Sequence, residues 1–305
     1  MKKLEEFDSV KNLLAETRLL TRSKNTELTY LKGIKKFVEI FGIEDLDKFV
    51  EELKKDQAKA NEIYKEFALK LASLELAPKT IRSWVSALKK LFSSNGIEVK
   101  KKIAMKVYTV HEDILPSKED LRKILENSSL RTKAIITFLA SSGLRASELI
   151  NLKIKDINLN ENPAKVYVRS LTAKERKARI TFISSEARKF LEEYLNERRK
   201  KEKISEESFV FVTKTGNKLS YQNLQYMLNK VFKLIAKKEG KRYTLHPHSL
   251  RKFFKTQLIS AGLPGPIVDR LVGHSRYLAN EYELYTENQL REWYKRGEKA
   301  LIILS

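Results

Sequence analysis

The sequence predicts a mainly α-helical protein, with an N-terminal helical bundle followed by a C-terminal helical unit that contains one small antiparallel sheet. Glycine and proline are sparse, at 10 and 6 in 305 residues. Apolar residues recur three and four positions apart through the first third, as in the run from Tyr30 to Phe41. Alternation of β-branched and aromatic residues is confined to 165–169 and 178–183, which a basic loop joins and which predict a hairpin.

Residues 1–105 carry the helical period in several consecutive segments. Asn25-Thr26 is expected to cap the first, which ends at Gly42, and further helices are expected over 46–53 and 63–74. Pro78 opens a helix over 81–92, and the stretch 93–96 ends it. These segments predict a compact bundle of four or five helices.

Residues 106–116 are expected to form a linker, because this stretch has no clean period and follows a lysine run. A second domain is expected over 117–305, opening where Ser117 and Asp120 form a capping-box-like start. Its helices are expected at 118–126, 131–142, from Ala146 onward, and then at 186–199, 219–237, 248–261, 264–272 and 287–299. The apolar tail 300–304 could pack on its own domain or on a neighbouring copy.

The charge balance points to a polyanionic partner. Net charge is +22, with +7 in residues 1–110 and +15 in the rest, so both parts are basic. Nucleic acid is the commonest polyanion and is therefore the expected partner. The absence of cysteine excludes disulfides, thiolate metal sites and a cysteine nucleophile. No apolar run reaches membrane-spanning length, so a cytoplasmic protein is expected, and the abundance of Lys and Glu favours a thermophilic source.

Two segments place arginine and histidine where they could bind a phosphate. Arg145 follows Gly143 at an expected helix start, where anions are favoured. On this motif alone, a surface pair between Arg145 and Glu148 is the favoured interpretation. His248 and Arg251 are three residues apart on one helix, and His274 follows Gly273 at a helix end.

A metal site built from His246, His248 and His274 is the alternative for the histidines. No Asp or Glu is expected to complete or orient such a metal shell, and Arg251 would repel a cation, so no metal is expected. The tyrosines at 277, 282, 285 and 294 could be core residues or nucleophiles. A phenol has a pKa near 10 and needs nearby cations or a base to react at neutral pH.

Taken together, these motifs resemble the tyrosine recombinase family of phage-integrase and Xer type. The resemblance rests on Ser-Gly-Leu-Arg-Ala-Ser-Glu-Leu at 142–149, His-Ser-Leu-Arg at 248–251, Leu-Val-Gly-His-Ser at 271–275 and a downstream tyrosine, in that order. The N-terminal bundle is similar to the family's SAM-like core-binding domain. The resemblance therefore implies the tyrosine recombinase fold along almost the whole chain.

The resemblance also assigns expected roles. Arg145 and Arg251 match the two phosphate-clamping arginines, and His248 and His274 match the first and second active-site histidines. Glu148 matches the acidic residue that supports the first arginine. The segment 172–179 resembles the family's hairpin loop and places Lys174 at the catalytic lysine, with Lys177 as the alternative.

The nucleophile departs from the family's spacing. The usual position, nine residues after the second histidine, is Glu283 here. Tyr282 lies eight residues after His274 and Tyr285 eleven. Leu290-Arg291 follows Tyr282 at the distance that Xer-type relatives show, so Tyr282 is the expected nucleophile and Tyr285 the alternative.

The activity that the resemblance implies is site-specific DNA recombination through a 3′-phosphotyrosyl intermediate, either for a mobile element or for dimer resolution. It implies a homotetramer on paired DNA sites, a monomer or dimer when free, and no cofactor. Two alternatives remain, a type IB topoisomerase-like enzyme that relaxes DNA and a DNA-binding protein without catalytic activity.

Overall fold

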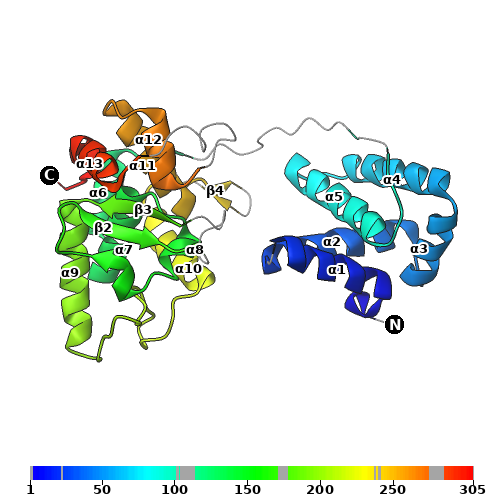
Figure 1. Cartoon of the computed structure of the whole chain (residues 1–305), viewed down its shortest axis with the longest axis horizontal. Helices are drawn as coiled ribbons and strands as arrows, with labels where there is room; N and C mark the ends of the chain where they lie inside the picture. The colour runs from blue at the N-terminus through cyan, green and yellow to red at the C-terminus, as the bar shows by residue number, and fades with distance from the viewer. Residues whose placement is uncertain are drawn as a thin grey trace. The chain divides into compact units, whose positions relative to one another are not determined.

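The computed structural model describes the chain except for residues 1–2, 22, 101–102, 104–113, 171–177, 237, 240–241, 275–284 and 305. The chain divides into two compact units, Met1–Val110 and His111–Ser305 (Figure 1). Most of the expected linker, 106–116, lies outside the described residues. At its end, the backbone N–H of Ile114 donates to the carbonyl of Thr244, so residue 114 belongs to the second unit.

The first unit is a bundle of five α-helices and one short 3-10 helix within its described residues. In chain order the elements are η1 (Leu4–Glu6), α1 (Asp8–Thr21), α2 (Lys24–Phe41), α3 (Leu46–Lys55), α4 (Gln57–Ala72) and α5 (Pro78–Ser94). The expected cap at Asn25-Thr26 is wrong by two residues. Ser23 is the N-cap, because its Oγ accepts from the backbone N–H of Thr26.

Helix α5 is the centre of this bundle and packs against α1, α2 and α4. Gly33 lets α2 approach it closely, since a Cβ there would lie 3.0 Å from the Cα of Trp84. The aromatic ring of Phe37 contacts Phe67 and Phe92 edge-on in the bundle interior. A separate hydrophobic core results, and none of its residues belongs to the core of the second unit.

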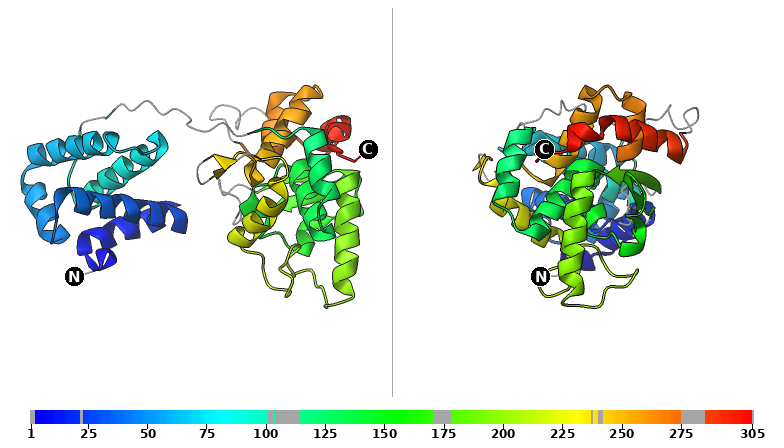
Figure 2. Two further views of the ribbon diagram at one scale, coloured as in Figure 1. Left: turned by 180° about the vertical axis from the view of Figure 1, so that it is seen from behind. Right: turned by 90° about the vertical axis from the view of Figure 1, so that its left-hand side faces the viewer.

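The second unit is helical around one small sheet (Figure 2). Its helices are α6 (Lys118–Glu126), α7 (Leu130–Ser142), α8 (Ala146–Leu149), η2 (Ile154–Asp156), α9 (Ser185–Arg199), α10 (Tyr221–Phe232), α11 (Pro247–Ser260), α12 (Gly265–Val272) and α13 (Glu287–Leu301). Ser117 and Asp120 form the expected capping box of α6. Helix α7 is buried at every residue from Ala134 to Ser142 and packs against α9 and α11.

The expected hairpin is present as β2 (Ala164–Val168) and β3 (Arg179–Ile183), paired antiparallel with Val168 opposite Arg179. β1 (Ile157–Asn158) extends this sheet beside β2. A second, two-residue pairing joins β4 (Lys238–Glu239) to β5 (Arg242–Tyr243). Strand β3 lies against α7, α12 and α13, and the candidate residues Arg145 and His274 follow the ends of α7 and α12.

Two helices are shorter than the sequence predicts. The helix from Ala146 ends after one turn at Leu149, because the following backbone bonds outward: the N–H of Val210 donates to the carbonyl of Leu152, and Lys153 forms a bridge with Phe209. Helix α10 ends at Phe232 rather than near 237. No helix in the described part of the chain has both the length and the apolar character needed to cross a bilayer.

The apolar tail packs on its own unit. Ile303 is buried, and the carboxylate of Glu186 accepts the backbone N–H groups of Ile303 and Leu304, at 3.0 and 2.8 Å. The guanidinium of Arg122 donates to the carbonyl of Ile303. Of the two alternatives for residues 300–304, the structure therefore shows the one within the same chain.

Candidate active site

Arg145 follows the end of the buried helix α7. Gly143 ends that helix with a φ of +64°, which favours glycine, and a Cβ there would lie 2.5 Å from the ring of Phe254 on α11. Arg145 is the N-cap of the short helix α8, and its side chain is 17% exposed. The close approach of two helices thus fixes the backbone two residues before the first candidate arginine.

Glu148 holds Arg145 from the interior. The carboxylate is 1% exposed and accepts the backbone N–H of Arg145 at 2.8 Å and its Nη1 at 3.1 Å. Arg179 on β3 donates to the same carboxylate from Nη1 and Nη2, at 3.0 and 2.7 Å. Burial by itself raises the pKa of Glu148, but the bonds and charge of Arg179, and then those of Arg145, outweigh it and hold the pKa below its ordinary value.

Helix α11 carries two further candidate residues, His248 and Arg251, which differ in their exposure to solvent. His248 lies in the first turn and is exposed, whereas Arg251 is 3% exposed. The guanidinium of Arg251 donates from Nη1 to the carbonyl of Gly143 and from Nη2 to the carbonyl of Val272, the latter at 2.7 Å. Arg251 therefore bridges the end of α7 and the end of α12.

His274 lies just beyond the end of α12. Gly273 ends the helix with a φ of +74°, and the backbone N–H of His274 donates to the carbonyl of Asp269 at 2.9 Å. Its ring, 41% exposed, lies with Nδ1 3.7 Å from Oδ1 of Asp269, which also accepts from Nζ of Lys255 at 2.6 Å.

Several charges act on the His274 ring. Partial burial is the largest cause that lowers its pKa below the ordinary value, and the positive charges of Arg251 and Lys255 lower it further. The carboxylate of Asp269 opposes them, and Arg145 contributes a smaller lowering. Arg145, which is more than a hundred residues before the other two in sequence, thus shares one electrostatic environment with Arg251 and His274.

The remaining predicted site residues are lysines and tyrosines, of which only two tyrosines lie in the described part of the chain. Lys174, Lys177, Tyr277 and Tyr282 lie outside the described residues. Tyr285 is half-buried and packs against the core of the second unit, one residue before Thr286, the N-cap of α13. Tyr294 is fully buried and donates from Oη to the carbonyl of Ser141 at 2.7 Å, and burial raises its pKa well above the ordinary value. Tyr294 is therefore a core residue.

His246 is the N-cap of α11, and its backbone N–H donates to Oγ of Ser249. The rings of His246 and His248 lie parallel with centroids 6.2 Å apart. Within the described ranges, no three His, Asp or Glu side chains gather in a way that could hold a metal ion.

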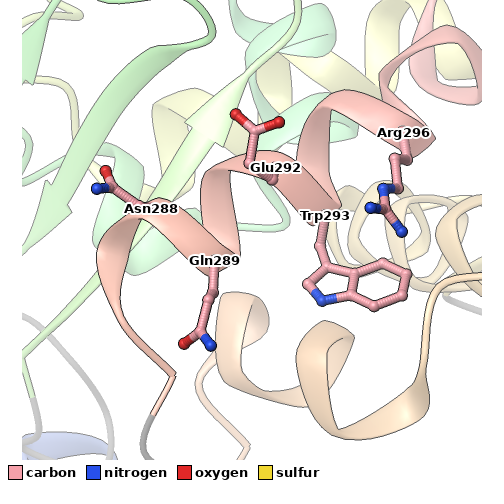
Figure 3. A pocket seen from close by; sticks show the side chains of 5 residues that line it. All are labelled: Asn288, Gln289, Glu292, Trp293 and Arg296. Atoms are coloured by element: carbon pink, nitrogen blue, oxygen red, sulfur yellow. The ribbon is translucent and has the colours of Figure 1, made fainter.

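A hollow on α13 is lined by Asn288, Gln289, Glu292, Trp293 and Arg296 (Figure 3). Figure 3 shows Gln289, Trp293 and Arg296 on one side of the helix, and the guanidinium of Arg296 lies 4.6 Å from the Trp293 ring centroid. None of the candidate phosphate-binding residues lines it. The hollow on α13 is therefore distinct from the candidate site.

Sequence reasoning did not assign Lys255 or Asp269 to the candidate site, and it used Arg179 only to align the segment 172–179 with the family's hairpin loop. Lys255 lies four residues after Arg251 on α11, so helical spacing alone could have placed it on the same face. Asp269 lies five residues before His274 at the end of α12, so the expectation that no acidic residue accompanies these histidines is wrong. Arg179 offered no such signal, because its contacts with Glu148 and Leu271 join distant parts of the chain.

Comparison with known proteins gives a family match. Residues 117–290 match the model of the phage integrase family. Over 173 residues the chain is 32% identical to the tyrosine recombinase XerC of Leptospira interrogans serovar copenhageni, covering 56% of this chain and 52% of that protein. Over 191 residues it is 30% identical to XerD of Oceanobacillus iheyensis, covering 60% and 61%. The chain thus spans about half to three fifths of the length of these relatives.

Solved structures share the fold at lower identity. The Tn1549 transposon integrase in complex with transposon right end DNA superposes with a TM-score of 0.61 at 19% identity, covering 94% of this chain and 98% of that one. XerH bound to a palindromic difH substrate in a post-cleavage complex gives 0.62 at 20% identity, covering 87% and 78%. These likenesses confirm the expected fold.

Proposed function

Because the chain belongs to the phage integrase family, we propose that it is a site-specific tyrosine recombinase that cleaves and rejoins DNA through a 3′-phosphotyrosyl intermediate. One observation carries this proposal. Arg145 and Arg251 both act electrostatically on His274, and Arg251 also bonds the carbonyls of Gly143 and Val272, which lie two residues before Arg145 and two before His274. Convergent cations of this kind fit a phosphodiester whose negative charge grows in the transition state.

The proposed reaction is a transesterification. Oη of Tyr282 attacks the phosphorus, the bond to the 5′-oxygen breaks, and a 3′-phosphotyrosyl bond and a 5′-hydroxyl form. Arg145, Arg251 and His274 stabilise the non-bridging oxygens, and His248 assists removal of the phenol proton. Lys174, or Lys177 in its place, protonates the leaving 5′-oxygen. The 5′-hydroxyl of a partner strand then reverses the reaction. The phosphotyrosyl bond retains the phosphodiester's energy, so no cofactor enters.

The proposed partner is a double-stranded DNA recombination site, bound by four protomers on paired sites. Support comes from the net charge of +22 and from the outer face of α10, which is free of acidic residues and exposes Tyr221, Gln222, Gln225, Tyr226 and Lys230.

Such a reaction takes place where the DNA is, so we propose that the protein is cytoplasmic. The expected domains, 1–105 and 117–305 with a linker 106–116, would let the two units contact one site together.

The proposed function is tested by removing the hydroxyl group of the proposed nucleophile. Tyr282→Phe is expected to abolish the covalent protein–DNA adduct on a nicked suicide substrate, because the attacking oxygen is removed. Tyr285→Phe is the matched control, since Tyr285 packs its ring against the core and phenylalanine retains that packing. The adduct is measured by denaturing gel after single-turnover incubation.

Three outcomes would count against parts of this proposal. Adduct formation by Tyr282→Phe but not by Tyr285→Phe would transfer the nucleophile to Tyr285. Relaxation of any supercoiled DNA by a monomer would favour the topoisomerase-like alternative. DNA binding by the unchanged protein with no adduct on any substrate would leave a DNA-binding protein without catalysis.

A further inference from the structure

Arg179 is a buried arginine at the start of β3 that the proposed mechanism does not use. It pairs with Val168 across the hairpin, and its side chain is 4% exposed. An arginine buried this deeply needs several acceptors, since an uncompensated charge in the interior costs several kcal/mol. The acceptors it has lie in two segments that both carry candidate catalytic residues.

The first acceptor is Glu148. Arg179 donates to both carboxylate oxygens, and Oε1 accepts from Nη1 of Arg179 at 3.0 Å and from Nη1 of Arg145 at 3.1 Å. One oxygen therefore lies between the two guanidinium groups. Displacing Arg179 would free Glu148 to move, and Arg145 with it.

The second acceptor is in the last turn of α12. Nε of Arg179 donates to the carbonyl of Leu271 at 3.1 Å, three residues before His274. The side chain also fills the space beside Gly273, where a Cβ would lie 2.7 Å from Cδ of Arg179. The end of α12, which His274 follows, is thus packed against the aliphatic part of the Arg179 side chain and hydrogen-bonded to its guanidinium group.

We propose that Arg179 is a positioning residue, which sets the separation between Arg145 and His274 by holding Glu148 and the end of α12 with one guanidinium group. The proposal rests on the proposed function for its catalytic consequence. Only arginine has three N–H directions in one rigid plane, which a bidentate carboxylate and a third acceptor require here. Lysine could keep the charge but not this geometry.

The effect on the reaction is expected in cleavage and not in DNA binding. A displacement of about 1 Å in a catalytic group can cost about 100-fold in rate. Arg179→Met, which keeps a similar stem, is expected to slow single-turnover adduct formation by about 100-fold while the Kd for the DNA site changes less than about threefold. The rate of adduct formation by Arg179→Lys is expected to lie between those of the wild-type protein and Arg179→Met.

Arg198→Met is the matched control. Arg198 is also buried in the second unit, pairs with Glu202 at 2.7 Å and donates to the carbonyls of Phe209 and Val210. Its loss removes the same kinds of bond without touching Arg145 or His274. If instability alone slowed cleavage, both methionine variants with matched thermal midpoints would be slowed equally, which would overturn the proposal.

A second measurement is independent of cleavage. The chain has four histidines, so the imidazole C–H signals can be followed by NMR and His274 assigned with His274→Gln. Arg179→Met is expected to shift the His274 signals, and Arg198→Met to leave them unchanged. If the wild-type protein forms no adduct but Arg179→Met still shifts the His274 signals, the proposed function is refuted and the positioning role stands. Unmoved His274 signals in Arg179→Met would overturn the positioning role. If Arg179→Met does not fold, Arg179→Lys is the deciding variant. Cleavage at the wild-type rate together with unshifted His274 signals in Arg179→Lys would overturn the positioning role.

Discussion

At the scale of single residues, the candidate site is governed by the excess of positive charge around His274. Arg251 and Lys255 both act to lower its pKa, and Asp269 is the one carboxylate among the groups that shift it. Asp269 also bonds Lys255, so it balances two cations at once. These groups lower the pKa of His274 in the free protein, and a bound phosphate would favour protonation of the ring.

This argument predicts the pH dependence of DNA affinity. A phosphate raises the pKa of His274 in the complex above its lowered value in the free protein, so the complex binds more protons over the interval between the two values. Affinity is expected to increase as pH falls from 8 through that interval and to level off below it. The Kd for a non-cleaved site, measured for wild type and His274→Gln, isolates this residue from the other histidines. Identical slopes for the two proteins would contradict the prediction.

Arg145, Arg251 and His274 could be predicted from the sequence because each lies in a short run of neighbours with a recognisable pattern. Helical spacing could have placed Lys255 on the face of Arg251, but its contact with Asp269 could not be predicted, since that contact depends on how α12 packs against α11. The roles of Arg145, Arg251, His248 and His274 remain predictions, as do those of Lys174 and Tyr282.

At the scale of elements, the site consists of two helix ends, each closed by a glycine with positive φ in a crowded place. Gly143 faces Phe254 and Gly273 faces Arg179. The sequence predicted the helices and the hairpin, whose periods are strong. It did not predict the early end of α8, which is determined by bonds from Leu152 and Lys153 to residues near 209.

Crowding at Gly143 can be separated from backbone strain by a pair of variants. Gly143→Ala is expected to lose about 1–2 kcal/mol of unfolding free energy from the left-handed backbone and about 1–3 kcal/mol more from the clash with Phe254. Gly262→Ala is the control, because Gly262 has a φ of +86° and nothing within 4 Å of the added Cβ. Urea denaturation measures both. Equal losses would show that Phe254 moves aside without cost.

At the scale of the whole molecule, each unit has its own hydrophobic core, and no residue is common to both. We therefore propose that residues 1–100 and 114–305 fold independently. The thermophile-like composition further leads us to expect thermal midpoints above about 65 °C, the upper end of the range for mesophilic domains.

Calorimetry of the full chain and of each part tests this independence. Phe37→Ala removes a fully buried ring and is expected to cost the first unit about 3–5 kcal/mol. Only the transition assigned to residues 1–100 should move to lower temperature, while the transition of 114–305 stays where it is in the isolated part. One transition that moves as a whole would contradict the proposed independence.

The docked C-terminal tail has a consequence for any assembly of this protein. Ile303 and Leu304 already bond Glu186 of their own chain. A tail that moved to the same position on a neighbour would exchange each bond for an identical one, so the exchange would add almost no contact energy. This is domain swapping, in which closure of a ring and local protomer concentration decide the outcome. DNA that gathers several protomers at one place would supply that concentration.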